Sequence, residues 1–276
     1  MRQKVLILVK TYPSPSTKYV ETVCTAGIRE DGKWVRIFPV PFRSYDEYER
    51  YSKYQWIECS LYKAEKDHRP ESFHLDESVP IVLGETVPTS DQWELRRRAI
   101  LDKVKVFTRK AELLAASQNN TATLAVFHPA SVKLKCEPAK NEPIEPRKLA
   151  AIRAQLNQLS FFEENDWRAE FKLAEPIPYD FKYEITDADG EVFTHKIIDW
   201  ELGALFLNQK KKKGLEGARL DVVDKYGNKF LDKDKIDLYL YLGTMHQFQQ
   251  RRMPNPWTII GVAPFKRVSV RQPELF

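Results

Sequence analysis

The sequence predicts a mixed α+β protein, mostly β, made of two small β-barrels that are joined by a proline-rich linker and a helix. Three observations favour this fold class. Short β-rich segments recur along the chain, longer stretches show helical periodicity, and residues 137–147 contain three prolines without apolar periodicity. Many short strands with few helices are typical of a small closed barrel rather than of a parallel sheet.

The first half begins with strand signals. Residues 5–9 form a short apolar run, and Asp31 with Gly32 marks a hairpin turn between the β-rich segments 19–28 and 33–40. We expect further strands at 56–64, 79–83 and 123–127. Between the last two, apolar spacing predicts one long helix over 91–116, with Asp91 and Glu94 as a capping box.

The second half repeats this plan. A helix begins at Pro146, and strands are expected at 171–186 and 192–198, followed by a helix over 200–213 and strands at 238–242 and 257–262. The OB-fold is the commonest barrel of this kind, so we predict two OB-like barrels, each with a long helix insertion. The predicted domains are an N-terminal barrel at 1–140, a linker and helix at 141–170, a C-terminal barrel at 171–270 and a tail peptide at 271–276.

Composition limits the class of protein. The chain has 44 Lys and Arg against 39 Asp and Glu, and its net charge of +5 permits a polyanionic partner. No apolar run reaches membrane-spanning length and the N-terminus lacks a signal peptide, which predicts a cytoplasmic protein without membrane contact. The three cysteines have no metal or disulfide spacing, so we expect buried thiols.

The segment 32–43 carries the strongest functional pattern. In a strand, Val35 and Ile37 face the core, while Trp34, Arg36 and Phe38 share the opposite face. An aromatic–arginine–aromatic face is typical of a strand that stacks bases and pairs a phosphate. The structural alternative is that both rings pack under the long helix or the other barrel, with Arg36 reaching the rim.

Basic residues extend this predicted nucleic-acid surface. Arg96, Lys103 and Lys110 recur every seven residues of the long helix and so form a basic stripe on it. This stripe could lie along a phosphate backbone, and the alternative is an ordinary solvated helix face. The loop before the last strand offers a second aromatic–cation site, for which turn chemistry is an equal explanation. The remaining candidates are Arg43, Arg251, Arg252 and Trp257.

Catalytic chemistry is not predicted. The chain lacks the phosphate-loop, dinucleotide, nucleophile-elbow and zinc-protease motifs, and we predict no catalytic residue, cofactor or metal. His195, Asp199 and Glu201 cluster in the sequence, which keeps a metal-dependent nuclease as an alternative. Asp199 as a helix N-cap is the simpler assignment.

The C-terminal tail is similar to the short peptides by which bacterial proteins dock on the DNA polymerase sliding clamp. Leu275 and Phe276 are suited to an apolar pocket, and Gln272 to polar contacts at its rim. The alternative is that this apolar end packs back on its own barrel. A clamp-docking tail makes an adaptor between a partner protein and the clamp an alternative function.

Several motifs together resemble the dual OB-containing domain proteins of bacteria. They lie at residues 10–16, 19–27, 34–43, 199–205, 242–244 and 255–262, so that the resemblance covers nearly the whole chain. It implies two OB-like barrels and nucleic-acid binding, in defence against phage or in DNA maintenance, without established catalytic residues. Relatives carry two cysteines and a histidine before the Asp-Trp-Glu motif, and only His195 is kept here. The leading hypothesis is a non-enzymatic protein that binds DNA or RNA.

Overall fold

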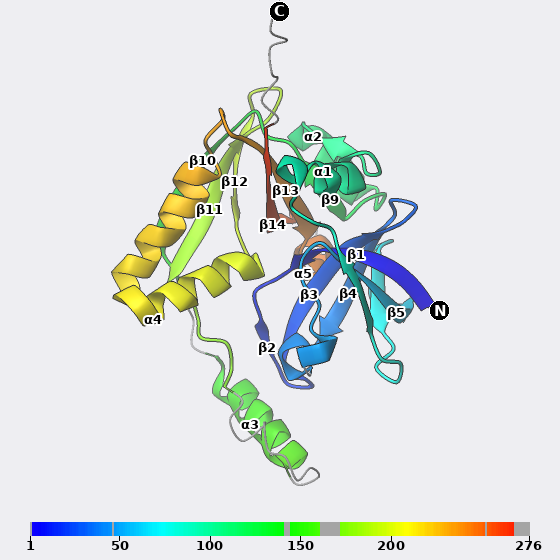
Figure 1. Ribbon diagram of the computed structural model, residues 1–276. Helices are drawn as coiled ribbons and strands as arrows, with labels where there is room; N and C mark the ends of the chain where they lie inside the picture. Colours follow the sequence, from blue (N-terminus) through cyan, green and yellow to red (C-terminus); the bar gives the residue numbers. More distant parts are fainter. Residues whose placement is uncertain (1, 46, 141–143, 161–171, 252, 268–276) are drawn as a thin grey trace, which may run out of the picture.

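The computed structural model describes residues 2–45, 47–140, 144–160, 172–251 and 253–267 (Figure 1). It confirms the predicted mixed α+β class and contains a closed five-stranded barrel with several helices. Within the described ranges no helix combines the length and the apolar character that a bilayer crossing requires.

The N-terminal barrel has the strand order β1-β3-β4-β6-β5, and pairing between β1 and β5 closes it. The contact between β4 and β6 is parallel and the other contacts are antiparallel, an arrangement that matches an OB-like barrel. β2 and β7 extend the sheet beside β3 and β5. The bounds are β1 Arg2–Lys10, β2 Ser14–Ser16, β3 Val20–Arg29, β4 Trp34–Val40, 3-10 turns η1 Phe42–Ser44 and η2 Glu47–Glu49, β5 Gln55–Lys63, β6 Ser72–Leu75 and β7 Val82–Thr86.

The C-terminal half repeats this order in two sheets, β10-β11-β12 and β14-β13-β9-β8. A parallel bridge between Ile197 and Ile259 links them, and β9 with β10 takes the place that β1 has in the first barrel. The bounds are β8 Val106–Phe107, β9 Leu124–Phe127, β10 Ser131–Pro138, β11 Tyr179–Thr186, β12 Val192–Lys196, β13 Ile236–Thr244 and β14 Trp257–Lys266.

The helices lie between these strands. α3 (Pro146–Ser160) begins at the predicted proline, and α4 (Trp200–Val223) is longer than predicted. Gly214 has a φ of 74° inside α4 and divides it into two helical segments at an angle (Figure 1). The π-helix η4 (Asp224–Lys229) follows α4, and α5 (His246–Gln250) lies between β13 and β14.

The prediction of one helix over 91–116 is wrong. The chain instead forms the turn η3 (Asp91–Trp93), α1 (Glu94–Leu101), β8 and α2 (Lys110–Gln118). Val106 and Phe107 pair in parallel with β9, and this pairing buries Phe107 in the second barrel's core. The capping box is also wrong, because Asp91 has a positive φ and the N-cap of α1 is Trp93, without a side-chain cap.

The proline-rich stretch 137–147 runs from the end of β10 to the start of α3. β10 pairs along its length with β11, and β9 pairs with β13, so that residues 124–138 belong to the sheets of the C-terminal half. Pro138 is the last residue of β10 and pairs with Tyr179, and Pro146 is the first residue of α3.

The two barrels share a hydrophobic cluster. Leu8, Ala26 and Ile28 of the first barrel pack there with Leu124 and Tyr241 of the second. Strands β3 and β4 thus face the C-terminal half rather than solvent over part of their length, which decides which side chains of β4 remain accessible.

Candidate nucleic-acid interface

The two faces of β4 divide as the sequence predicts, but its outer face is not one surface. Val35 and Ile37 are buried in the first barrel's core. Trp34, Arg36 and Phe38 point outward into three different environments, which are a groove, the contact between the barrels and open solvent.

Arg36 corrects the expectation of a solvent-facing guanidinium, because it is only 4% exposed. Its Nη1 donates to the Thr244 carbonyl oxygen at 3.1 Å, and its Nη2 donates to the Thr123 carbonyl at 2.8 Å. Both acceptors belong to the C-terminal half. The second barrel therefore covers the middle of the predicted face, and Arg36 joins the two halves.

Neighbouring charges complete this contact. Arg69 also donates to the Thr244 carbonyl, at 2.7 Å, and is paired with Asp67. The Glu71 carboxylate accepts from the Thr123 amide at 2.8 Å and from its hydroxyl at 2.7 Å. Such a network fixes the orientation of the barrels, since buried charges need these partners.

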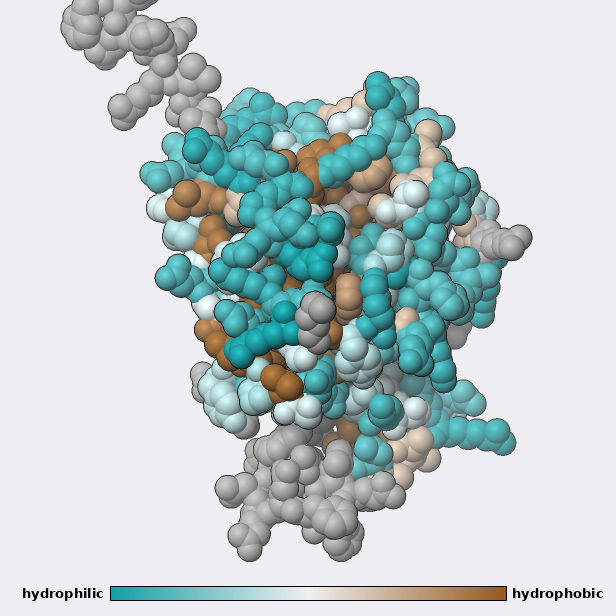
Figure 2. Space-filling view, turned by 90° about the vertical axis from the view of Figure 1, so that its right-hand side faces the viewer, coloured by the Kyte–Doolittle hydropathy of each residue, from teal (hydrophilic) through white to brown (hydrophobic). Residues whose placement is uncertain are grey.

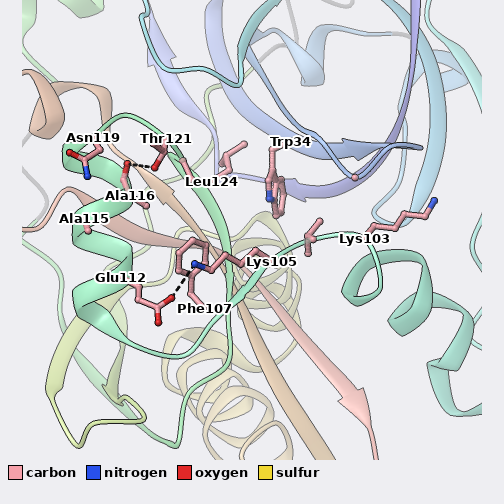
Figure 3. A pocket seen from close by; sticks show the side chains of 13 residues that line it. Trp34, Lys103, Lys105, Phe107, Glu112, Ala115, Ala116, Asn119, Thr121 and Leu124 are labelled. Carbon is pink, nitrogen blue, oxygen red and sulfur yellow. Dashed lines mark hydrogen bonds and ion pairs between the residues drawn. The ribbon is translucent and has the colours of Figure 1, made fainter.

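Trp34 lines a groove of about 650 Å³ between the barrels. Figure 3 shows its ring pointing into this space from β4, with Leu124 beside it and α2 on the opposite side. The Trp34 ring meets Tyr241 edge-on, with centroids 6.4 Å apart. This contact holds the indole in place while part of it remains exposed.

The polar rim of the groove includes Lys103, Lys105 and Asn119. Lys105 is paired with Glu112 at 3.2 Å. The Lys103 side chain extends away from Trp34 (Figure 3), and its Nζ lies 5.9 Å from the centroid of the Trp56 ring. Lys103 is thus a cation at the rim of the groove that forms no ion pair among the described residues. Lys105 was not among the predicted contacts, because a helix was expected where the chain turns at 102–103 and enters a strand at 106–107.

Phe38 belongs to an exposed aromatic row on β4, β6 and β5. Tyr62 lies opposite His74 in register, with ring centroids 5.4 Å apart, and His74 Nδ1 contacts the Phe38 carbonyl at 2.7 Å. Phe38 is 45% and Tyr62 55% exposed. His74 was not predicted as a site residue, because no strand was expected at β6. Tyr62 could have been found, since it falls at an outward position of the predicted strand 56–64.

The predicted basic stripe does not exist, because the chain leaves the helix after Leu101. Arg96 stacks on Tyr54 at 4.2 Å and donates to the Val87 carbonyl at 2.8 Å. Lys110 lies in α2 and pairs with Glu191 at 3.3 Å. Of the three stripe residues, Lys103 alone lines the groove.

The other predicted contacts are scattered. Trp257 is 3% exposed, and its Nε1 donates to the Leu113 carbonyl at 3.1 Å, so the expectation of an accessible ring is corrected. Arg43 pairs with the buried Glu21 at 2.8 Å. Arg251 directly follows α5, is exposed, and does not line the groove. Outside the described residues lie Arg252, Gln272, Leu275 and Phe276.

The alternative metal cluster is not assembled. Asp199 caps α4 by accepting from the Glu201 amide at 3.0 Å, and it also accepts from the Val262 amide at 3.1 Å. His195 is buried, and this burial lowers the pKa of its imidazole to about 4. In the described part of the chain, no group of three or more His, Cys, Asp and Glu side chains is arranged to hold a metal ion.

One face of the protein is mainly hydrophilic. Figure 2 shows hydrophobic side chains only in small groups between hydrophilic ones on this face. A face of this kind is suited to a polar or charged partner rather than to a broad apolar interface.

Two protein families match the chain, one over each half. Residues 107–276 match the family described as "Domain of unknown function (DUF8757)". The chain belongs to the DUF8757 family. Ahead of the DUF8757 region, residues 1–102 match "Domain of unknown function (DUF8758)", so residues 103–106, between α1 and the end of β8, separate the two matches.

Other comparisons add little to the DUF8757 assignment. None of the curated proteins matches the chain. Among solved structures, one titled "Structure of murine DNA binding protein bound with ds DNA" aligns over 98% of each chain at 11% identity with a TM-score of 0.33. Similarity of that degree supports no inference about this chain.

Proposed function

We propose that this protein binds single-stranded nucleic acid without catalysing a reaction, with the groove between its barrels as the principal site. The observation that carries the proposal is the Trp34 ring, which is held by Tyr241 and lines the groove with Lys103. An aromatic ring inside a groove and a cation at its rim match the two chemical features of an unpaired nucleotide, a flat base and a charged phosphate.

The size of the groove supports a strand rather than a duplex. The groove has a volume of about 650 Å³ and lies between two packed barrels. Asn119 and Thr121 offer polar groups along one side of it. Unpaired bases stack on aromatic side chains, with each stacked base contributing about 1–3 kcal/mol. The exposed row of Phe38, His74 and Tyr62 offers a further stacking surface for a longer strand.

The test is fluorescence anisotropy with labelled single-stranded DNA and RNA of about 16 nucleotides, with duplexes as competitors, over a salt series. We expect Trp34→Ala to weaken single-strand binding roughly 5–150-fold, and Trp34→Phe to retain most of it. Lys103→Ala should reduce the slope of log affinity against log salt by about 1. Lys66→Ala is the matched control, because Lys66 is exposed and lies outside the groove.

Unfolding curves accompany each variant, since Trp34 packs against Tyr241. Unchanged affinity in a folded Trp34→Ala protein would remove the groove as the site. Failure of the wild type to bind either oligonucleotide would remove the proposed function itself.

Docking on the sliding clamp through Gln272, Leu275 and Phe276 stays a prediction from sequence, as does a role in defence or DNA maintenance. Deleting residues 272–276 should abolish co-purification with the clamp while leaving oligonucleotide binding intact. An interaction that survives the deletion would end the adaptor alternative.

A further inference from the structure

A second pocket, of about 290 Å³, lies in the C-terminal half and shares no lining residue with the groove. Its apolar lining includes Val132 of β10, Phe230 after η4 and Leu238 of β13. Thr108, which directly follows β8, is a polar residue of the lining. An apolar pocket with a few polar groups is the usual form of a small-molecule site.

The one carboxylate that lines the pocket has both oxygens engaged. Asp237 Oδ1 contacts His128 Nε2 at 2.9 Å, and Oδ2 accepts from Arg97 at 2.8 Å and from the Tyr239 hydroxyl at 3.2 Å. Burial would raise the pKa of Asp237, but the hydrogen bonds from Arg97 and His128 outweigh it and lower that pKa. Asp237 is therefore ionised, and the guanidinium of Arg97 balances its charge. Its other oxygen orients His128.

His128 is held on a second side as well. Its ring stacks on Tyr239 with centroids 4.6 Å apart and an interplanar angle of 30°. With Nε2 directed to Asp237, the other ring nitrogen is the one left for a ligand. The side chain is 39% exposed, so the imidazole is not sealed in the core.

Two cations line the same pocket without a balancing acid. Lys233 Nζ lies 3.3 Å from the Ala130 carbonyl, and Arg267 Nε donates to the Ile236 carbonyl at 3.3 Å. Both residues are exposed, and neither forms an ion pair within the described ranges. Since Arg97 already offsets Asp237, the pocket has an excess of positive charge.

We propose that this pocket binds a nucleotide, with its ring against the apolar lining and its phosphate near Lys233 and Arg267. His128 supplies a hydrogen bond to the ring or sugar. The chemistry is that of a flat ring joined to an anion, and either a free nucleoside monophosphate or the terminal nucleotide of a strand carries it. The site does not depend on binding in the groove.

Calorimetric titration with the four nucleoside monophosphates tests the site directly. We expect binding to the wild type and shifts of the His128 imidazole signals in NMR spectra. Lys233→Ala with Arg267→Ala should weaken binding about tenfold or more, as expected for lost charge-assisted contacts. Lys266→Ala is the matched control, because Lys266 is the exposed neighbour of Arg267 and does not line the pocket.

Ala188→Trp keeps the test independent of folding, because Ala188 is exposed and lines the pocket, so a large side chain there fills it from outside. This variant should abolish nucleotide binding, whereas Trp34→Ala should leave it unchanged. Oligonucleotides with and without a 5′-phosphate then separate a strand end from a free nucleotide. No binding of any monophosphate, inorganic phosphate that binds as tightly as they do, or binding that survives Ala188→Trp would overturn the proposal.

Discussion

The guanidinium of Arg36 donates to the main-chain carbonyl of Thr244 at 3.1 Å, and this contact connects β4 of one barrel with the end of β13 in the other. The same guanidinium reaches the Thr123 carbonyl at 2.8 Å. A guanidinium, which is chemically suited to bind a phosphate, thus orients the two barrels instead. Its neighbours on β4, Trp34 and Phe38, remain accessible because they lie at the two ends of the covered region.

Arg36→Met should lower the free energy of unfolding by about 1–3 kcal/mol. The substitution leaves the buried Thr123 carbonyl without this donor, and each orphaned polar group costs about 1–3 kcal/mol. Urea unfolding measures the change. Arg98→Met serves as control, because Arg98 is 67% exposed and paired with Glu94 on the surface, where such pairs contribute under about 1 kcal/mol. Equal losses in the two variants would contradict an orienting role for Arg36.

Gly203→Ala should destabilise the protein although alanine is the better helix former. A Cβ at Gly203 would lie 2.1 Å from Cδ2 of Tyr12, a residue of the first half that approaches α4. The clash should cost about 1–3 kcal/mol, more than the helix gains of about 0.5–1 kcal/mol. Combining it with Tyr12→Ser should recover part of the loss in thermal unfolding, and strictly additive effects would show that the two residues do not meet.

Asp199→Ala should be far more damaging than Glu201→Ala, although both were candidates for metal binding. Asp199 caps α4, accepts from Val262 and lies 3.6 Å from the nearly buried Lys53, so its loss should cost about 3–5 kcal/mol. Glu201 is exposed, and its replacement should change stability by under about 0.5 kcal/mol. Chelator or Mg²⁺ should leave the wild-type Tm unchanged, and a metal-dependent rise in Tm that Asp199→Ala removes would restore the metal hypothesis.

Acid should destabilise the fold through His195. Its folded pKa is lowered from 6.5 to about 4 by burial, so below pH 6.5 the unfolded chain binds a proton that the folded state does not. The stability present above pH 6.5 is therefore lost as pH falls toward 4, by up to about 3 kcal/mol. His195→Gln should remove this part of the pH dependence, whereas His68→Gln, at an exposed position, should parallel the wild type. Coincident slopes for His195→Gln and the wild type would contradict the assignment.

Much of the strand pattern was predictable because it is local. Alternation in residues 33–40 placed Val35 and Ile37 in the core, and both are buried. The helix at 146 followed from its proline and its apolar stripe. The helix over 91–116 failed because apolar spacing at Val104 and Phe107 suits either a helix or an extended segment, and pairing with β9 selected the extended form.

The sequence by itself determined which side chains of β4 face inward, since alternation is a property of the backbone of a strand. It also determined the α+β class and the presence of an aromatic and basic outer face. Only the tertiary structure decided how that face is used, because burial of Arg36 depends on Thr123 and Thr244, which lie far along the chain. The same packing left Trp34 in a groove and Phe38 in solvent, since a second barrel covers only the part of a strand that it touches.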